Sequence, residues 1–336
     1  DTDLIDISKL DSKTQKYILE NLPTNMQSNI NKISEDIFNR DKIAKVFENM
    51  GFSEKENRNG IFAPVDLQEK VFDKMNFGRY GDIFFSEDDL DNISKMLNQG
   101  NHKDFWKKQT PEDLIVYCLR YKNLFSDFYT PPVIERMGDK FWDNVIKNLE
   151  NSTPSEDELT ALARYTGESS NQINAALTAR QNNQNSNQIY LKYADDLAQL
   201  LDKHVLTEDI HVYMGSDYIE PLNTLKLKDG TSILDVIENP SKFKDRSKEI
   251  DALLNGFVVN QERFMSTSLV EENHSHRFAK VNYDFTLKAG SNALFRNIYT
   301  NVNNHEIEMI VQKDSKIIFK GIDWDTGKII ADVVTN

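Results

Sequence analysis

The chain has 336 residues, of which 39% are hydrophobic and 10% aromatic, which is enough for packed cores and excludes global disorder. Its formal net charge is −14, so we expect no nucleic-acid partner, because binding phosphates requires a basic surface. The single cysteine, Cys118, excludes an intramolecular disulfide and a cysteine-based metal site. No apolar run approaches the ~18 residues that cross a bilayer, so we expect no membrane span.

The first part of the chain has mostly helical patterns. Across the first fifty residues, apolar side chains recur at helical spacing. Thr110-Pro-Glu-Asp113 combines an N-cap threonine with proline at the first helical position. Thr153-Pro-Ser-Glu156 repeats a cap signature and follows a polar stretch, which indicates a boundary. We therefore predict a helical domain over residues 1–150 and a second domain over residues 151–336.

In the second domain, the spacing of the apolar residues changes near residue 209. Helical spacing continues from Leu159 to Leu201, whereas alternation typical of strands follows. Asp325-Thr-Gly327 predicts a hairpin turn between the last two strands. Helices followed by strands indicate an α+β fold rather than alternating βαβ units. We expect strands near residues 209–213, 257–259, 264–265, 281–287, 293–295, 306–311, 316–321 and 328–334.

Two short motifs lie on these strands about forty residues apart. Ser266-Thr-Ser268 ends an apolar strand and places small hydroxyls at a strand edge. Glu306-Ile-Glu308 enters a later strand, and period-2 alternation predicts that both carboxylates lie on one face. Two neighbouring acids on an apolar strand have a cost in desolvation and repulsion, so we expect them to have a function.

These motifs are preceded by the helical segment Tyr165-Thr-Gly-Glu-Ser-Ser-Asn-Gln-Ile-Asn174. In this order and spacing, residues 150 to 336 resemble the bacterial mono-ADP-ribosyltransferase toxins. The branch they resemble most is the enzymatic component of actin-modifying binary toxins, including the vegetative insecticidal kind. The resemblance implies a catalytic domain of two packed antiparallel sheets with flanking helices. It also implies an N-terminal domain that binds a translocation component, secretion by a bacterium, and action in the host cell cytoplasm.

The resemblance further implies that NAD is the substrate and that no metal is needed. Glu308 would stabilise the oxocarbenium-like centre that forms as nicotinamide leaves, and Ser266 would hydrogen-bond Glu308. Glu306 would orient or deprotonate the guanidinium of a target arginine, since relatives with Gln at this position favour other acceptors. The implied reaction transfers ADP-ribose from NAD to an arginine of a host protein, with actin as the leading guess.

The residues that would contact NAD include one departure from the family pattern. The family's first strand ends in an aromatic residue followed by Arg, whereas this chain has Tyr213 followed by Met214. Methionine offers neither a charge nor a bidentate donor to a phosphate. The resemblance assigns the NAD pocket to Tyr165, Tyr213, Met214, Gly215, Thr267 and Ser268.

Three basic residues are candidates to replace the missing arginine. Arg263 lies just before the serine motif, where the family has Asn. Arg277 and Lys280 lie in the loop from Glu271 to Lys280, which corresponds to the family's phosphate–nicotinamide loop, where a basic residue is expected. Tyr299 and His305 lie in the stretch that the family uses to meet its protein substrate. His274 and His276 have no third ligand at metal spacing, so we expect no metal site there.

Met214 leaves three interpretations open: a natural substitution with another cation in place of the arginine, an engineered or attenuated variant, or a domain that has lost activity. The first corresponds to an active transferase, and the alternative is a catalytically silent binding module that keeps the fold. A further alternative is an NAD glycohydrolase without a protein acceptor.

Overall fold

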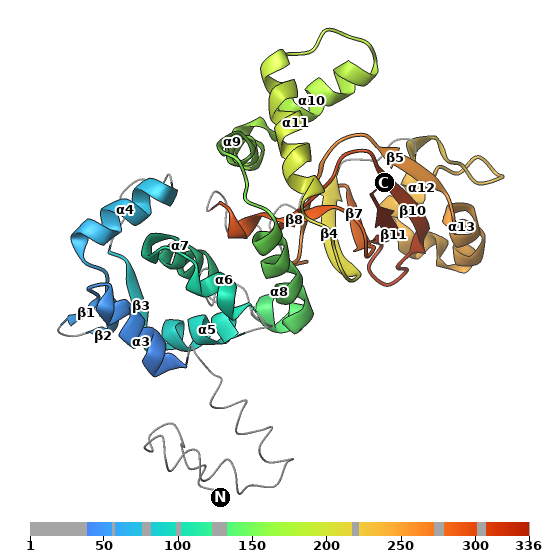
Figure 1. Ribbon diagram of the computed structural model, residues 1–336. Helices are drawn as coiled ribbons and strands as arrows, with labels where there is room; N and C mark the ends of the chain where they lie inside the picture. The colour runs from blue at the N-terminus through green and yellow to red at the C-terminus, as the bar shows by residue number, and fades with distance from the viewer. Residues whose placement is uncertain are drawn as a thin grey trace, which may run out of the picture. The chain divides into compact units, whose positions relative to one another are not determined.

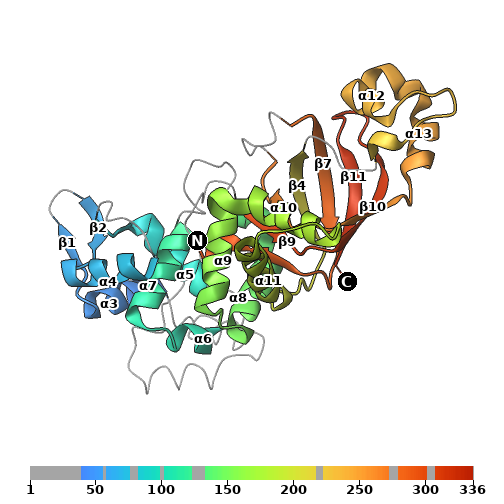
Figure 2. The same cartoon turned by 90° about the horizontal axis from the view of Figure 1, so that it is seen from above.

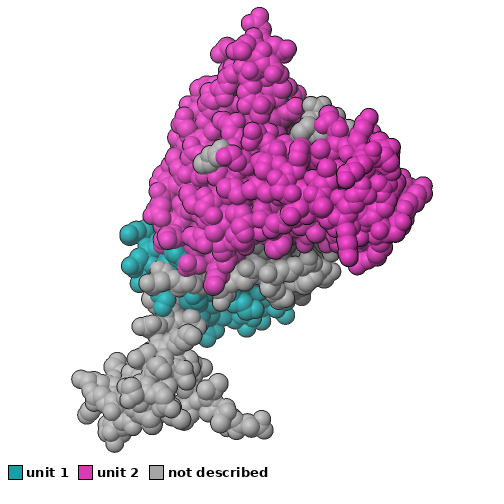
Figure 3. Space-filling view, turned by 90° about the vertical axis from the view of Figure 1, so that its right-hand side faces the viewer, with its two compact units in different colours: residues 1–118 teal, residues 119–336 magenta. Residues whose placement is uncertain are grey.

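The structure is a computed structural model that describes residues 39–55, 58–75, 82–98, 102–122, 133–216, 222–271, 279–300 and 307–335 (Figure 1). The chain divides into two compact units, 1–118 and 119–336 (Figure 3). Within the described residues, no helix is long and apolar enough to cross a membrane. The helical prediction for the start of the chain falls mainly on residues 1–38, which lie outside the described residues.

The first unit combines helices with a small antiparallel sheet of order β1-β2-β3. Three phenylalanine rings, Phe47, Phe52 and Phe85, stack in its core with centroids 5.0 to 5.9 Å apart. The prediction of a mostly helical region is therefore confirmed, with a short sheet added. Its described elements are α3 (Arg40–Asn49), β1 (Ser53–Lys55), β2 (Arg58–Phe62), α4 (Val65–Met75), β3 (Phe84–Ser86), α5 (Glu87–Asn98), α6 (Lys103–Lys107) and α7 (Pro111–Lys122), which ends in the second unit.

The second unit has its helices mostly before its strands, which confirms the α+β prediction. In Figure 2, α12 and α13 lie beyond β10 and β11 at one end of the sheet. Its described helical elements are α8 (Val133–Asn151), α9 (Glu156–Arg164), the π-turn η2 (Tyr165–Ser169), α10 (Ser170–Gln181), α11 (Gln188–Asp202), η3 (Leu222–Thr224), α12 (Ile233–Glu238), η4 (Pro240–Arg246), α13 (Ser247–Leu254) and η6 (Arg296–Ile298).

The strands of the second unit form one hydrogen-bonded sheet of order β5-β10-β11-β7-β4-β6-β9-β8. The two halves of this sheet meet where β4 pairs with β6, through the single register pair Tyr213 and Ser268. The two sheets expected from the sequence are therefore joined at the β4–β6 pair. One strand pair, β11 with β7, is parallel rather than antiparallel. The strands are β4 (Ile210–Ser216), β5 (Val258–Gln261), β6 (Met265–Ser268), β7 (Val281–Leu287), β8 (Ala293–Phe295), β9 (Glu308–Val311), β10 (Ser315–Ile322) and β11 (Ile329–Val334).

Helix α8 belongs to the second unit, although the sequence predicted a boundary after residue 150. The rings of Phe141 and Trp142 meet Phe295 of β8 edge-on, at 5.4 and 5.9 Å between centroids. The Asn144 side chain donates to the carbonyl of Val205 at 3.0 Å. The polar stretch that indicated a boundary is thus the end of a helix that packs on the sheet. The partner-binding role of residues 1–150 stays a prediction.

Helix α9 starts two residues later than its cap signature predicted. Ser155 is the N-cap, and its hydroxyl accepts from the main-chain N–H of Glu158 at 3.2 Å. The Glu158 carboxylate accepts in return from the main-chain N–H of Ser155 at 2.7 Å. This reciprocal capping box fixes the start of the helix that leads to Tyr165.

Candidate active site

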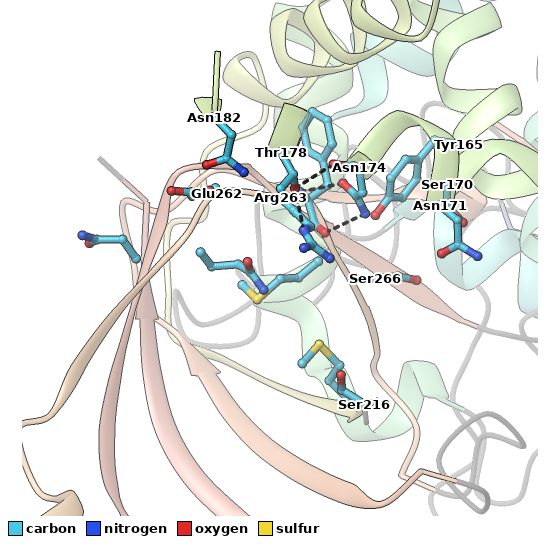
Figure 4. Close-up of a pocket in the computed structure, with 15 residues that line it drawn as sticks. Tyr165, Ser170, Asn171, Asn174, Thr178, Asn182, Ser216, Glu262, Arg263 and Ser266 are labelled. Atoms are coloured by element: carbon cyan, nitrogen blue, oxygen red, sulfur yellow. Dashed lines mark hydrogen bonds between the residues drawn. The ribbon is translucent and has the colours of Figure 1, made fainter. Parts of the chain in front are cut away.

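A pocket of about 760 Å³ opens between the helices that follow α9 and the edges of β4, β5 and β6 (Figure 4). Most side chains around it carry amides or hydroxyls, and Arg263 supplies a guanidinium. Such a lining suits a large polar ligand with many hydrogen-bonding groups. The residues that line the pocket are Tyr165, Ser170, Asn171, Asn174, Thr178, Asn182, Met214, Ser216, Asn260, Gln261, Glu262, Arg263, Phe264, Met265 and Ser266.

The helical wall is fastened to the strand that carries the serine motif. Asn174 of α10 accepts from the main-chain N–H of Phe264 at 3.2 Å, and its amide donates to the Phe264 carbonyl at 3.4 Å. The ring of Tyr165 meets that of Phe264 edge-on at 5.6 Å. Burial raises the pKa of the Tyr165 phenol, and the negative charge of Glu308 raises it further, whereas a hydrogen bond with Asn174 lowers it. Tyr165 is therefore a neutral phenol in this wall.

Met214 and Arg263 line the same pocket from different elements. Met214 is buried on β4, at the position where the resemblance predicts an arginine. Arg263 precedes β6, and its Nε donates to the hydroxyl of Thr178 at 2.9 Å, which aims the guanidinium along the α10 wall (Figure 4). The structure thus places Met214 and one of the three predicted replacement cations, Arg263, in the lining of one pocket.

Ser266 and Glu308 are joined by a hydrogen bond across the β6–β9 pair, as predicted. Ser266 is exposed and lines the pocket, whereas Glu308 is only 3% exposed. The serine hydroxyl donates to Oε1 of the carboxylate. The hydrogen bond links a buried carboxylate to the pocket wall. A negative charge in such a buried position interacts more strongly with a nearby positive charge than it would in water.

Arg296 lies on the other side of this carboxylate. Its Nε forms an ion pair with Oε2 of Glu308, and its side chain is fully buried. The neighbouring Asn297 accepts from the main-chain N–H of Glu308 at 3.2 Å. Neither residue was predicted from the sequence. A lone arginine within the apolar segment 293–299 was the signal, because a buried cation requires a partner.

Strand β9 begins at Glu308, two residues later than predicted. The residue before it, Ile307, has φ = 46°, which is rare for a β-branched side chain. Its carbonyl accepts from the N–H of Leu269 at 3.0 Å, and its side chain is buried, so the surroundings hold this conformation. Regular strand alternation therefore does not extend to Ile307, and because Glu306 lies outside the described residues, the placement of both carboxylates on one face stays a prediction.

Several predicted pocket residues lie beside the pocket rather than on its wall. The Thr267 hydroxyl donates to the Met309 carbonyl at 2.7 Å, so it ties β6 to β9. Ser268 is buried, and its hydroxyl accepts from the N–H of Val270 at 3.1 Å. Tyr213 is half-buried, with the Lys328 ammonium 5.7 Å from its ring centroid. Gly215 is half-buried between the pocket residues Met214 and Ser216.

Tyr299 is buried, not exposed as a contact for a protein substrate would be. Its hydroxyl lies 3.0 Å from Nε2 of His204, which is also buried. Burial lowers the pKa of His204 to about 4, with the charge of Lys203 adding to the effect and that of Glu158 opposing it. The histidine is therefore neutral near pH 7. In this arrangement Tyr299 supports the segment that carries Arg296.

The remaining predicted site residues lie either outside the described residues or outside the pocket lining. Glu306, His305 and Arg277 lie outside the described residues, so their roles stay predictions. Lys280 is exposed just before β7 and is not part of the pocket lining. Among the described residues, no cluster of three or more His, Cys, Asp or Glu could hold a metal ion.

The model of the ADP-ribosyltransferase exoenzyme family matches residues 135–334. The chain therefore belongs to this family of bacterial toxins. The match begins within α8, at residue 135. The second compact unit also begins before residue 151, at Leu119.

Solved structures of three such proteins are similar to this chain. Plx2a, an ADP-ribosyltransferase toxin from Paenibacillus larvae, is 22% identical with a TM-score of 0.44, over 60% of this chain and 98% of its own. The C3 exoenzyme of Clostridium limosum is 22% identical with a TM-score of 0.43, over 57% and 91%. C2-I, the enzymatic component of the C2 toxin of Clostridium botulinum, is 20% identical with a TM-score of 0.41, over 59% and 47%. No curated protein matches the sequence.

Proposed function

We propose that this chain transfers ADP-ribose from NAD to an arginine of a host protein, with release of nicotinamide. The observation that carries the proposal is the Ser266–Glu308 hydrogen bond at the wall of a polar pocket. NAD is the substrate that the pocket accepts, and the amide-rich lining supplies donors and acceptors for its ribose and phosphate groups. Membership of the exoenzyme family supports the reaction class.

In this proposal, the carboxylate of Glu308 stabilises positive charge on the ribose as the bond to nicotinamide breaks. A fixed negative charge in a nearly dry site acts on the transition state more strongly than a solvated one. Ser266 holds one carboxylate oxygen in place. Tyr165 and Phe264 are almost fully buried and pack edge-on against each other, so they support the pocket wall from behind.

Arg263 takes the place of the cation that Met214 lacks. A guanidinium is the side chain best suited to a diphosphate, because its donors form a planar fork. Thr178 orients Arg263 toward the pocket that Met214 also lines. This arrangement supports an active enzyme.

The choice of arginine as acceptor rests on the sequence, in which Glu306 is the first acid of the motif. A carboxylate at this position orients or deprotonates a guanidinium. Actin is the leading candidate target, by the resemblance to binary toxins alone. Delivery by a translocation component bound to residues 1–150 follows from the same resemblance, as do secretion and action in the host cytoplasm.

Met214 favours a second candidate, a catalytically silent module that keeps the fold for binding. A third, an NAD glycohydrolase, differs from the first only in the acceptor. Incubation with labelled NAD and either host lysate or purified actin separates them. The proposal predicts label on a protein with the unmodified chain and none with Glu308→Gln. Label only after Met214→Arg supports the silent module, and nicotinamide release without labelled protein supports the hydrolase.

A further inference from the structure

Glu308 is held by two consecutive residues of the short helix η6. Arg296 pairs with the carboxylate, and Asn297 accepts from the main-chain N–H of the same residue at 3.2 Å. Both are buried, with Arg296 fully so. Ser266 binds the other carboxylate oxygen. The Glu308 side chain is therefore held by Ser266 on the pocket side and by Arg296 on the buried side.

Helix η6 is itself anchored to elements far away in the sequence. The Arg120 guanidinium donates to the carbonyl of Ile298 at 2.5 Å. The Phe295 ring, directly before η6, packs against α8, and β8 pairs with β9 from Ala293 to Phe295. The segment that carries Arg296 is therefore a rigid support. A support of this kind restricts the carboxylate to one orientation, which is the condition for electrostatic preorganisation.

We propose that Arg296 is a positioning residue for the transferase reaction and acts through Glu308. Its guanidinium fixes Oε2, so that the carboxylate keeps the orientation in which Ser266 connects it to the pocket. This inference rests on the proposed function of Glu308. It adds the fully buried Arg296 to a site so far described by Ser266 and Glu308, and it assigns a role to that arginine.

An alternative role for the same contact is inhibitory. A cation beside a carboxylate offsets the negative charge that should stabilise the ribose cation. In that case removal of Arg296 would raise turnover. The double anchoring of Glu308, through its carboxylate and its main chain, favours positioning, because charge neutralisation alone requires no fixed main-chain contact.

The test is a double-mutant cycle with Arg296→Met and Glu308→Gln in the full chain, read as nicotinamide release from NAD. Arg296→Met keeps much of the side-chain volume without the charge, and Arg296→Lys keeps the charge without the planar fork. Rates are divided by the folded fraction at the assay temperature, measured by near-UV circular dichroism. We expect Arg296→Met to lower kcat about 10- to 100-fold with KM for NAD within about threefold, since small misplacements of a reacting group have effects of this size. Arg296→Lys should recover part of the loss.

In the Glu308→Gln background, Arg296→Met should lower kcat no further, because the arginine acts only through the acid. Equal losses in both backgrounds would overturn the inference, as would unchanged or higher kcat of Arg296→Met per folded molecule. The proposed function fails separately, if the unmodified chain releases no nicotinamide or if Glu308→Gln turns over at the unmodified rate. Either of those results removes the basis of the inference as well.

Discussion

Ser266 donates a hydrogen bond to Glu308, and this contact joins an exposed hydroxyl in a pocket to a carboxylate that is almost fully buried. The two residues come from β6 and β9, which pair in register between Met265 and Ser268. The strand pairing therefore positions the acid. The pocket itself lies between η2 and α10 on one side and the edges of β4, β5 and β6 on the other.

Removal of the Ser266 hydroxyl should lower turnover because it frees one oxygen of Glu308. We expect Ser266→Ala to reduce kcat for nicotinamide release about 10- to 100-fold, since a hydrogen bond to a charged group contributes about 1.5–3 kcal/mol. Thr267→Val is the matched control, because the Thr267 hydroxyl donates to the Met309 carbonyl on the opposite face. It should change thermal stability and leave kcat nearly unchanged. Equal kcat losses in the two variants would contradict this assignment.

Glu308→Gln should destabilise the fold as well as inactivate it. The substitution leaves the fully buried Arg296 without its counter-charge, and breaking a buried pair on one side costs about 3–5 kcal/mol. Urea unfolding measures this difference. Glu249→Gln, which breaks an exposed pair with Arg246, is the control and should cost at most about 1 kcal/mol. A Glu308→Gln variant as stable as the unmodified chain would show that the buried pair is not coupled to folding.

Arg263 and Met214 can be tested by exchanging them. Arg263→Met should raise KM for NAD about 10-fold or more, because it removes the guanidinium from the pocket. Adding Met214→Arg to this variant should restore part of the affinity, since it places a guanidinium on β4 at the same pocket. NAD affinity is measured by isothermal titration, so that binding is read apart from turnover. Unchanged affinity in Arg263→Met would show that another residue holds the diphosphate.

His204 should make stability fall in mild acid. The folded state keeps its pKa near 4 by burial, against 6.5 for an ordinary histidine. The unfolded chain therefore binds the extra proton between these values, so the contribution is full above pH 6.5 and is lost as pH falls to 4. The loss amounts to about 3 kcal/mol. His204→Gln keeps a hydrogen-bonding group for Tyr299 and should flatten the dependence of the free energy of unfolding on pH between these values. An unchanged pH dependence in this variant would contradict the assignment.

Helix α8 should be necessary for a stable catalytic unit. Phe141 is 1% exposed and packs on Phe295, so Phe141→Ala should cost about 3–5 kcal/mol in the free energy of unfolding. A fragment of residues 119–336 should show a sharper thermal transition than one of residues 152–336, which lacks α8. Leu159→Ala, at a partly exposed position of α9, is the control for Phe141→Ala. Equal stability of the two fragments would return the boundary to residue 151.

The sequence predicted the parts of the site that depend on local pattern. Ser266 and Glu308 lie in short polar motifs on apolar strands, and their order along the chain matched a known family. Arg296 was missed because its partner is twelve residues away and meets it only through the pairing of β8 with β9. The departure at Ile307 was also hidden, since alternation assumes a regular strand and tertiary packing holds this residue at positive φ. The predicted boundary at residue 150 differs from the division of the structure into units, because polar residues at the end of α8 resemble a linker.

The most direct test of the account is the rate of nicotinamide release from NAD by the full chain and by Glu308→Gln, each corrected for its folded fraction. The account predicts turnover by the unmodified chain and a loss of about 100-fold or more in kcat in the variant, the scale expected when a preorganised electrostatic group is removed. A variant that keeps kcat within about threefold of the unmodified chain would contradict the central role of Glu308.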